Sequence, residues 1–360
     1  MIVQLHKQPT GLSSLLEIPT SFFKWVEWSD EFDESLFPIW FNEVFGSTNN
    51  RQNGLYQKFN NLFNSYKRIE DPVRRAEIIN AYTDGIQIEN LCNGIADIKA
   101  VPIAKFDEIS KELKAVLMHL WNNSLQDSGF ERNIAKTTVK KFVANFMSEH
   151  KTQICPFCGL EGYMYLDGQS RPALDHWLSK DDFPYSSVNF DNLVPIGDKC
   201  NASPAKGTKN VLTITNSNRV FYPFTRHDGI KVNIKWNQKT KLLSAKDVVF
   251  EIEVKPLNNT QKDLFDSWDA LFNITTNYES YLVGNLLNNW KGIYKEFICG
   301  NIMLNPAQNI KELIINLKHW RGSFQPNITP GYLIYHAFID RLLIMPKAYL
   351  YGLCEYFKNS

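Results

Sequence analysis

Five short segments between residues 155 and 207 stand out from the rest of this chain: CPFC at 155–158, LDHWLSK at 174–180, NFDNLVP at 189–195, KCN at 199–201 and KG at 206–207. Cys, Gly, Pro, Asp and Asn are concentrated here, which is typical of a small module built from loops and turns rather than of a helix bundle. We therefore expect a compact module in the middle of the chain.

The flanking sequence predicts helices on both sides of this module. Apolar residues recur at spacings of three and four from Phe106 to Leu120, in a helix expected over Phe130 to Met147, and again from Lys262 to Ser360. Alternating and β-branched runs predict strands at 211–215, 220–222, 232–236 and 248–254. The expected fold class is α+β, in four parts: a helical domain over 1–150, the compact module over 151–212, a β-rich basic extension over 213–256 and a helical C-terminal domain over 257–360.

Composition excludes several classes of protein. The 360 residues include 39 Lys+Arg and 38 Asp+Glu, so the net charge of +1 rules out a uniformly basic nucleic-acid coat. A hydrophobic content of 44% supplies a core and excludes global disorder. The most apolar stretch, Tyr332 to Cys354, contains His336, Asp340, Arg341 and Lys347, and the N-terminus lacks the apolar core of a signal peptide. These features predict a soluble, cytoplasmic protein with no membrane association.

Three of the six cysteines are grouped in a way that indicates a metal site. Cys155 and Cys158 form a C-x-x-C, and Cys200 follows about forty residues later. In an intracellular chain this grouping favours Zn²⁺ over a disulfide. Three thiolates leave a fourth position to fill, for which Asp198 and His150 are the nearest candidates. The alternatives are a zinc ion held by three protein ligands and water, or no structural zinc.

Between these cysteines lie residue types suited to hydrolysis. The Asp175 carboxylate and the Asn201 amide oxygen are hard ligands that suit Mg²⁺ or a similar ion such as Mn²⁺ or Ni²⁺. His176 has a side chain whose ordinary pKa suits it to take a proton from water near neutral pH. A divalent ion beside such a base is what hydrolysis of a phosphodiester requires.

In this order and spacing the segments resemble the HNH endonucleases, ββα-metal nucleases of the zinc-knuckle type. The resemblance covers about 55 of the 360 residues. It implies that His176 is the general base, that Asp175 and Asn201 hold the catalytic ion, and that Asn192 braces the loop that orients the histidine. It also implies structural zinc on Cys155, Cys158 and Cys200. The second knuckle of the family reads C-x-x-C, whereas this chain has Gly197 at the first of those positions.

Positive charge follows the module directly. From Lys199 to Ala245 there are nine basic residues and one acid, Asp228. This surplus is typical of a surface that binds a phosphate backbone, but a Lys-rich solvent edge of a β-hairpin would look the same. The candidate nucleic-acid contacts are Lys180, Lys199, Lys206, Lys209, Arg219 and Arg226, and aromatic residues that can stack on bases are Phe221, Tyr222, Phe224 and Trp236.

Three functions fit the pattern. The first is a metal-dependent endonuclease that cuts DNA, and the resemblance further implies a role in bacterial defence against phage or foreign DNA beside an ATPase or another subunit of such a system. The second is a zinc-knuckle adaptor that binds nucleic acid or a protein without cleaving, which the Gly197 departure favours. The third is a toxin that cleaves RNA.

Overall fold

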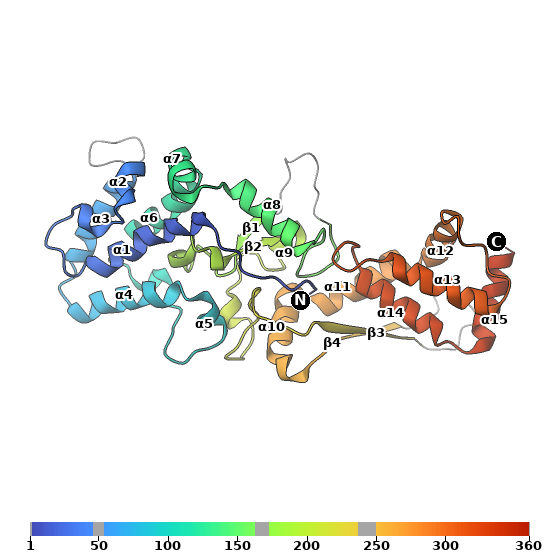
Figure 1. Cartoon of the computed structure of the whole chain (residues 1–360). Helices are drawn as coiled ribbons and strands as arrows, with labels where there is room; N and C mark the ends of the chain where they lie inside the picture. The colour runs from blue at the N-terminus through green and yellow to red at the C-terminus, as the bar shows by residue number, and fades with distance from the viewer. Residues whose placement is uncertain (1, 46–53, 163–172, 237–249, 360) are drawn as a thin grey trace. The chain divides into compact units, whose positions relative to one another are not determined.

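The computed structural model describes residues 2–45, 54–162, 173–236 and 250–359 (Figure 1). The fold class is α+β, with helices at both ends of the chain and two small antiparallel sheets. The chain forms two compact units. The N-terminal unit comprises Leu5–His150 and Met164–Thr225, and the C-terminal unit comprises Met1–Gln4, Lys151–Tyr163 and Arg226–Ser360.

Among its described residues, the N-terminal unit has eight α-helices followed by a short strand pair and a short α-helix. Its elements are α1 (Glu17–Trp25), α2 (Trp40–Phe45), α3 (Leu55–Lys67), α4 (Pro72–Gly85), α5 (Ile88–Cys92), α6 (Ser110–Asn122), α7 (Ser128–Phe130), α8 (Val139–His150), β1 (Ala173–His176), β2 (Leu193–Ile196) and α9 (Asp198–Asn201). α6 packs against α3 and buries Leu113, Val116, Leu117 and Leu120, the stripe that the sequence predicts. α4 begins where the Asp71 side chain accepts a hydrogen bond from the Val73 amide, with Pro72 in the first turn.

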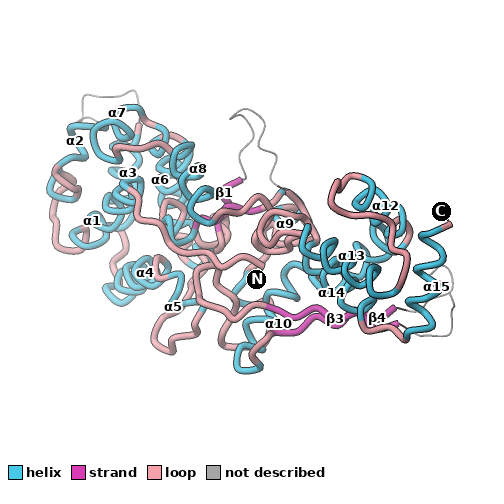
Figure 2. Tube along the Cα trace, turned by 45° about the vertical axis from the view of Figure 1, so that its right-hand side comes forward, coloured by secondary structure: helices cyan, strands magenta, loops and turns pink. Residues whose placement is uncertain are grey.

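The strand pair lies in the part of the chain that is richest in loops (Figure 2). β1 and β2 are antiparallel, with Asp175 opposite Val194 and His176 opposite Leu193. α9 follows β2 after a single residue, Gly197, and packs against β1. This β–β–α arrangement carries Asp175, His176 and Asn201 on neighbouring elements.

In the part of the C-terminal unit that the structure describes, there are a β-hairpin and six α-helices. Its elements are β3 (Ile230–Trp236), β4 (Phe250–Pro256), α10 (Lys262–Phe272), α11 (Ile274–Tyr281), α12 (Trp290–Cys299), α13 (Ile310–Ser323), α14 (Tyr332–Leu343) and α15 (Lys347–Lys358). The hairpin buries Val232, Ile234 and Trp236 and packs against α14. The CPFC turn belongs to this unit, because Phe157 stacks on Phe272 and the Tyr278 hydroxyl donates to the Cys158 carbonyl at 2.9 Å.

Three expectations about secondary structure are corrected. The helix expected over Phe130 to Met147 is interrupted at Lys136, which has a positive φ of 53°, and α8 begins only at Val139. The expected strand at 211–215 is instead a 3₁₀ turn over Val211–Thr213, because the Asn210 side chain accepts a hydrogen bond from the Leu212 amide. Residues 220–222 are buried but form no strand, since the Val220 amide bonds to the Cys92 carbonyl rather than to a sheet.

The two compact units divide the chain differently from the four parts expected from the sequence, since residues 151–163 group with the C-terminal helices. The four-part division stays a prediction. In the described residues, none of the helices combines the length and the apolar character needed to cross a bilayer.

Candidate active site and metal cluster

Asp175 and His176 end strand β1, next to a buried lysine. Lys206 has 1% of its surface exposed, and its Nζ lies 2.6 Å from Oδ2 of Asp175. The same ammonium donates to the backbone carbonyl of His176 at 2.7 Å. Burial raises the pKa of Asp175, and the neighbouring ammonium opposes that effect. The pair places a cation on the carboxylate that the sequence analysis assigned to a divalent ion.

The His176 ring is held in one orientation by two neighbours. Its Nε2 lies 2.8 Å from the Ser187 carbonyl oxygen, and its ring meets that of Trp121 edge to face at 4.4 Å. A carbonyl oxygen only accepts hydrogen bonds, so Nε2 carries the proton and Nδ1 of the neutral ring carries the lone pair. Burial lowers the pKa of His176 to about 4, which keeps the ring neutral at pH 7. The residue retains 6% of its surface exposed.

Asn192 braces the loop that follows β1. Its side chain is fully buried, accepts a hydrogen bond from the Leu178 amide at 2.7 Å and donates to the Leu178 carbonyl at 3.1 Å. Its amide group also donates to Ser186, to Oγ at 3.0 Å and to the carbonyl at 3.3 Å. Ser187, the residue after Ser186, provides the carbonyl that lies next to His176 Nε2, so the Asn192 side chain is bonded to the segment that carries this carbonyl.

Asn201 is the last residue of α9. Its backbone carbonyl accepts a hydrogen bond from the Gly207 amide at 3.1 Å, and its backbone amide donates to the Gly197 carbonyl at 2.9 Å. The residue is half-buried, and α9 packs against the strand that carries Asp175. The oxygen donors of Asp175 and Asn201 suit a hard divalent cation, and Lys206 shows that a positive charge is accommodated at Asp175.

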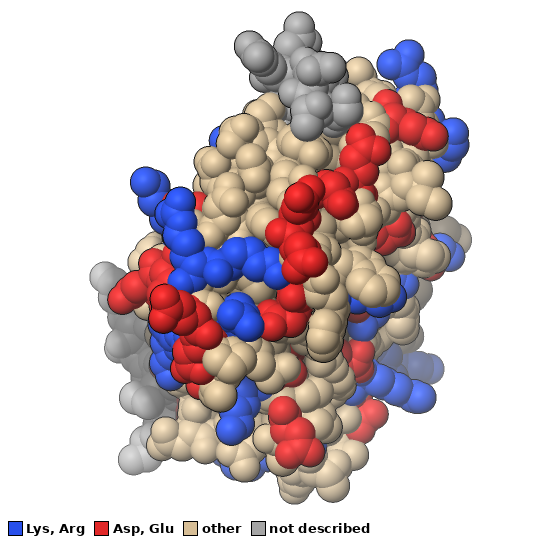
Figure 3. All heavy atoms as spheres, turned by 90° about the vertical axis from the view of Figure 1, so that its left-hand side faces the viewer, with Lys and Arg blue, Asp and Glu red and all other residues tan. Residues whose placement is uncertain are grey.

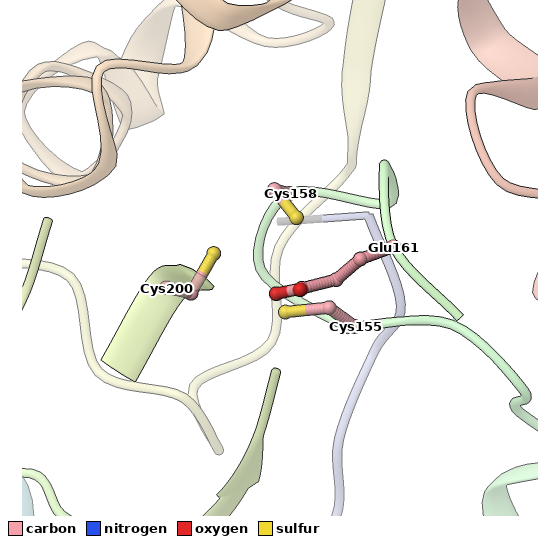
Figure 4. Close-up of side chains that lie close together, drawn as sticks. All are labelled: Cys155, Cys158, Glu161 and Cys200. Atoms are coloured by element: carbon pink, nitrogen blue, oxygen red, sulfur yellow. The ribbon is translucent and has the colours of Figure 1, made fainter. Parts of the chain in front are cut away.

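The cysteines form a cluster that can hold a metal ion. Cys155, Cys158, Glu161 and Cys200 each offer one ligand atom, and all four atoms lie within 4.8 Å of one another (Figure 4). Ligand atoms around a tetrahedral zinc with Zn–S bonds of about 2.3 Å are separated by about 3.8 Å. Cys158 Sγ also accepts a hydrogen bond from the Leu160 amide at 3.4 Å, and Gly159 adopts a positive φ of 65° in the turn.

Glu161 is the fourth residue of this cluster, in place of the two expected candidates. Asp198 is exposed. His150 has both ring nitrogens engaged, because Nε2 accepts from the His6 amide at 2.8 Å and Nδ1 lies 2.7 Å from the Phe146 carbonyl oxygen. The signal that could have identified Glu161 is its spacing, since a carboxylate three residues after a C-x-x-C lies within reach of the same ion.

The candidate nucleic-acid contacts differ widely in exposure. Lys199, Arg219 and Arg226 are exposed, Lys180 and Lys209 are half-buried, and Lys206 is buried. Lys206 is therefore a partner of Asp175 in this structure, not a surface contact. Two further lysines of the basic run, Lys239 and Lys241, lie outside the described residues. On the face shown in Figure 3, basic and acidic side chains are interspersed and neither sign covers the surface.

The aromatic residues among these charges belong to the core. Phe221, Tyr222 and Trp236 have 4%, 0% and 6% of their surfaces exposed. The Tyr222 hydroxyl donates to the Asp191 carbonyl at 2.8 Å, and Phe224, which is half-buried, contacts the Tyr222 ring at 5.6 Å. Burial of these rings excludes the first three as stacking platforms for bases.

No family model, no curated protein and no solved structure matches this chain.

Proposed function

We propose that this chain is a metal-dependent endonuclease that hydrolyses phosphodiester bonds in DNA. The observation that carries the proposal is the β–β–α arrangement of β1, β2 and α9, which brings Asp175, His176 and Asn201 onto neighbouring elements. It is supported by the bond from His176 Nε2 to the Ser187 carbonyl, which leaves Nδ1 as the nitrogen able to take a proton.

In this proposal each residue of the site has a separate role. His176 Nδ1 accepts the proton of a water molecule that attacks the phosphorus, and Asn192 keeps the ring in place through the 178–187 loop. Asp175 and Asn201 hold a divalent ion such as Mg²⁺, which stabilises negative charge on the phosphate and the departing oxygen when bound. Exposed Lys199 and Arg219 and half-buried Lys180 and Lys209 are proposed to contact the phosphate backbone.

The test is cleavage of supercoiled plasmid by the purified chain with Mg²⁺, Mn²⁺ or Ni²⁺. Loss of a general base lowers the rate by roughly 10²–10⁴, so His176→Ala should abolish detectable nicking. His336→Ala is the matched control, because His336 lies on α14 of the C-terminal unit and its Nε2 likewise lies next to a backbone carbonyl oxygen, that of Phe324. Cleavage by His176→Ala at the wild-type rate would remove His176 as the base. Parallel incubations with single-stranded DNA and tRNA separate a DNA-cleaving enzyme from one that cleaves RNA.

We also propose that Cys155, Cys158, Glu161 and Cys200 hold a structural zinc ion. Three thiolates and one carboxylate are ligands that Zn²⁺ accepts, and all four lie close together. Metal analysis of the purified protein should find one zinc per chain, and Cys158→Ser should lose it. Retention of a full equivalent of zinc by Cys158→Ser would contradict the assignment.

One observation favours a second function, a zinc-knuckle adaptor that binds without cleaving. Only 6% of the His176 surface is exposed. Asp175 and His176 are also consecutive residues of β1, and consecutive side chains of a strand point to opposite faces of the sheet. A general base must come within hydrogen-bond distance of the attacking water. An adaptor would bind DNA or a protein while showing no metal-dependent cleavage in the plasmid test.

A further inference from the structure

Lys206 connects the two elements that carry the proposed metal ligands. Its side chain reaches β1, where Nζ lies 2.6 Å from Asp175 Oδ2 and donates to the His176 carbonyl at 2.7 Å. Its main chain reaches α9, because the Lys206 amide donates to the Cys200 carbonyl at 3.1 Å. The amide of the next residue, Gly207, donates to the Asn201 carbonyl at 3.1 Å.

Gly207 makes this double connection sterically easy. It has a φ of 47°, in the left-handed region that glycine adopts without strain. The chain can therefore turn directly after Lys206, so that two successive amides face the end of α9 while the lysine side chain extends to β1. The Lys-Gly pair that the sequence analysis noted is thus a link within the module.

The burial of Lys206 explains what the link does electrostatically. With 1% of its surface exposed, the lysine has no access to a phosphate on the protein surface. A buried carboxylate without a partner is strongly unfavourable, and so is a buried ammonium. The Asp175 side chain is 14% exposed, and the ion pair at 2.6 Å between Nζ and Oδ2 provides each charge with an opposite one.

We propose that Lys206 is a positioning residue and the built-in counter-ion of Asp175. It holds β1 and α9 together at the site and neutralises the Asp175 carboxylate in the metal-free protein. The part of the inference that concerns a divalent ion rests on the proposed function. An ion that binds Asp175 would replace the Lys206 ammonium as the partner of the carboxylate. The pairing of Lys206 with Asp175 does not depend on that function.

The first experiment is a mutant cycle on the full chain in the presence of EDTA. Lys206→Met removes the charge at similar length and leaves the Asp175 carboxylate unpaired, so the melting temperature should fall by about 5 °C or more. Asp175→Asn combined with Lys206→Met removes both charges and should recover at least half of that loss. Lys114→Met is the control, because Lys114 forms an exposed pair with Asp181 at 3.4 Å and its loss should shift the melting temperature by about 1 °C or less. If Lys206→Met does not fold, Lys206→Gln replaces it in the same cycle.

The second experiment measures Mn²⁺ binding by calorimetry and by its effect on the melting temperature. Without a competing ammonium, Lys206→Met should bind Mn²⁺ about tenfold more tightly than the wild type and gain more stability from it. A lysine that acted only as a hydrogen-bonded link would lower the melting temperature and leave Mn²⁺ binding unchanged.

The outcomes separate this inference from the proposed function. Simple additivity of Asp175→Asn and Lys206→Met would overturn the counter-ion role, and so would Mn²⁺ binding that is detectable in both the wild type and Lys206→Met and equally tight in the two. Recovery in the double variant without a response to Mn²⁺ in any variant would support the pairing and count against the metal-dependent nuclease. Recovery together with tighter Mn²⁺ binding would support both.

Discussion

The two small sheets of this chain are built from similar parts and are surrounded very differently. The β3–β4 hairpin follows the simple rule for a half-buried sheet. Its apolar residues face the helices, and its lysines lie beside glutamates on the exposed face, as in the Lys235–Glu251 pair at 3.7 Å and the Lys255–Glu253 pair at 3.4 Å. The charged face of the hairpin therefore matches the solvent-edge interpretation of the basic run.

The β1–β2 pair has only four residues in each strand and lies among buried polar groups. Among the described residues, twelve polar or charged ones are buried, and seven of these lie between positions 176 and 206. Such groups cost stability unless each is hydrogen-bonded, and they add less than apolar packing would. The comparison teaches that the β1–β2 region is organised around positioned polar side chains, whereas the hairpin is organised around apolar burial.

The largest difference between the two sheets should appear in the loss of stability when an asparagine side chain is removed from each region. Asn192→Ala removes the acceptor of the Leu178 amide and the donor to the Leu178 carbonyl and to Ser186, so the free energy of unfolding should fall by about 3 kcal/mol. Asn233→Ala on the hairpin removes one hydrogen bond to Glu253, and the expected loss is about 0.5 kcal/mol. Denaturant titration of both variants measures the difference. Equal losses would mean that the two sheets are stabilised in the same way.

A smaller difference should appear in the pH dependence of stability. In the unfolded chain His176 becomes protonated below its ordinary pKa of 6.5, whereas in the folded state its pKa is about 4. Wild-type stability should therefore fall as the pH is lowered through this window, by about 2 kcal/mol more between pH 7.5 and 5 than in His176→Gln.

The hairpin provides the control for this experiment. The Asn233 hydrogen bond lowers the pKa of Glu253 from 4.5, so its contribution to stability is lost only at pH values below that window. Glu253→Gln should therefore follow the wild-type curve between pH 7.5 and 5. A His176→Gln curve parallel to the wild type would show that His176 titrates normally and that its ring is not buried in the neutral form.

The same contrast explains what could be predicted from sequence. Periodicity identified α6, the hairpin strands and the C-terminal helices, because apolar burial leaves a regular pattern. The residue types at Asp175, His176 and Asn192 predicted a site. The partners of Lys206 could not be inferred, because a lysine next to a glycine is expected at the surface. Glu161 was missed because its only signal is its spacing of three residues after the C-x-x-C, and this spacing alone does not identify a ligand. The strand expected at 211–215 did not form because a local hydrogen bond from the Leu212 amide to the Asn210 side chain outweighed β propensity. The strand expected at 220–222 did not form because the Val220 amide bonds to the distant Cys92 carbonyl.

The smallest expected effect distinguishes a lysine near the proposed site from one on the hairpin. Lys180 Nζ lies 5.9 Å from the centre of the Trp121 ring, which in turn contacts His176. If the module cleaves DNA, Lys180→Gln should raise KM roughly three- to tenfold, leave kcat nearly unchanged and reduce the slope of log KM against log salt by about 1, the change expected for one phosphate contact. Lys235→Gln removes the same charge from the hairpin, where Glu251 already pairs with it, and should change neither KM nor the salt slope. The same shift in both variants would mean that plasmid binding depends on overall charge, and the difference between the two sheets would then have no bearing on how the substrate is held.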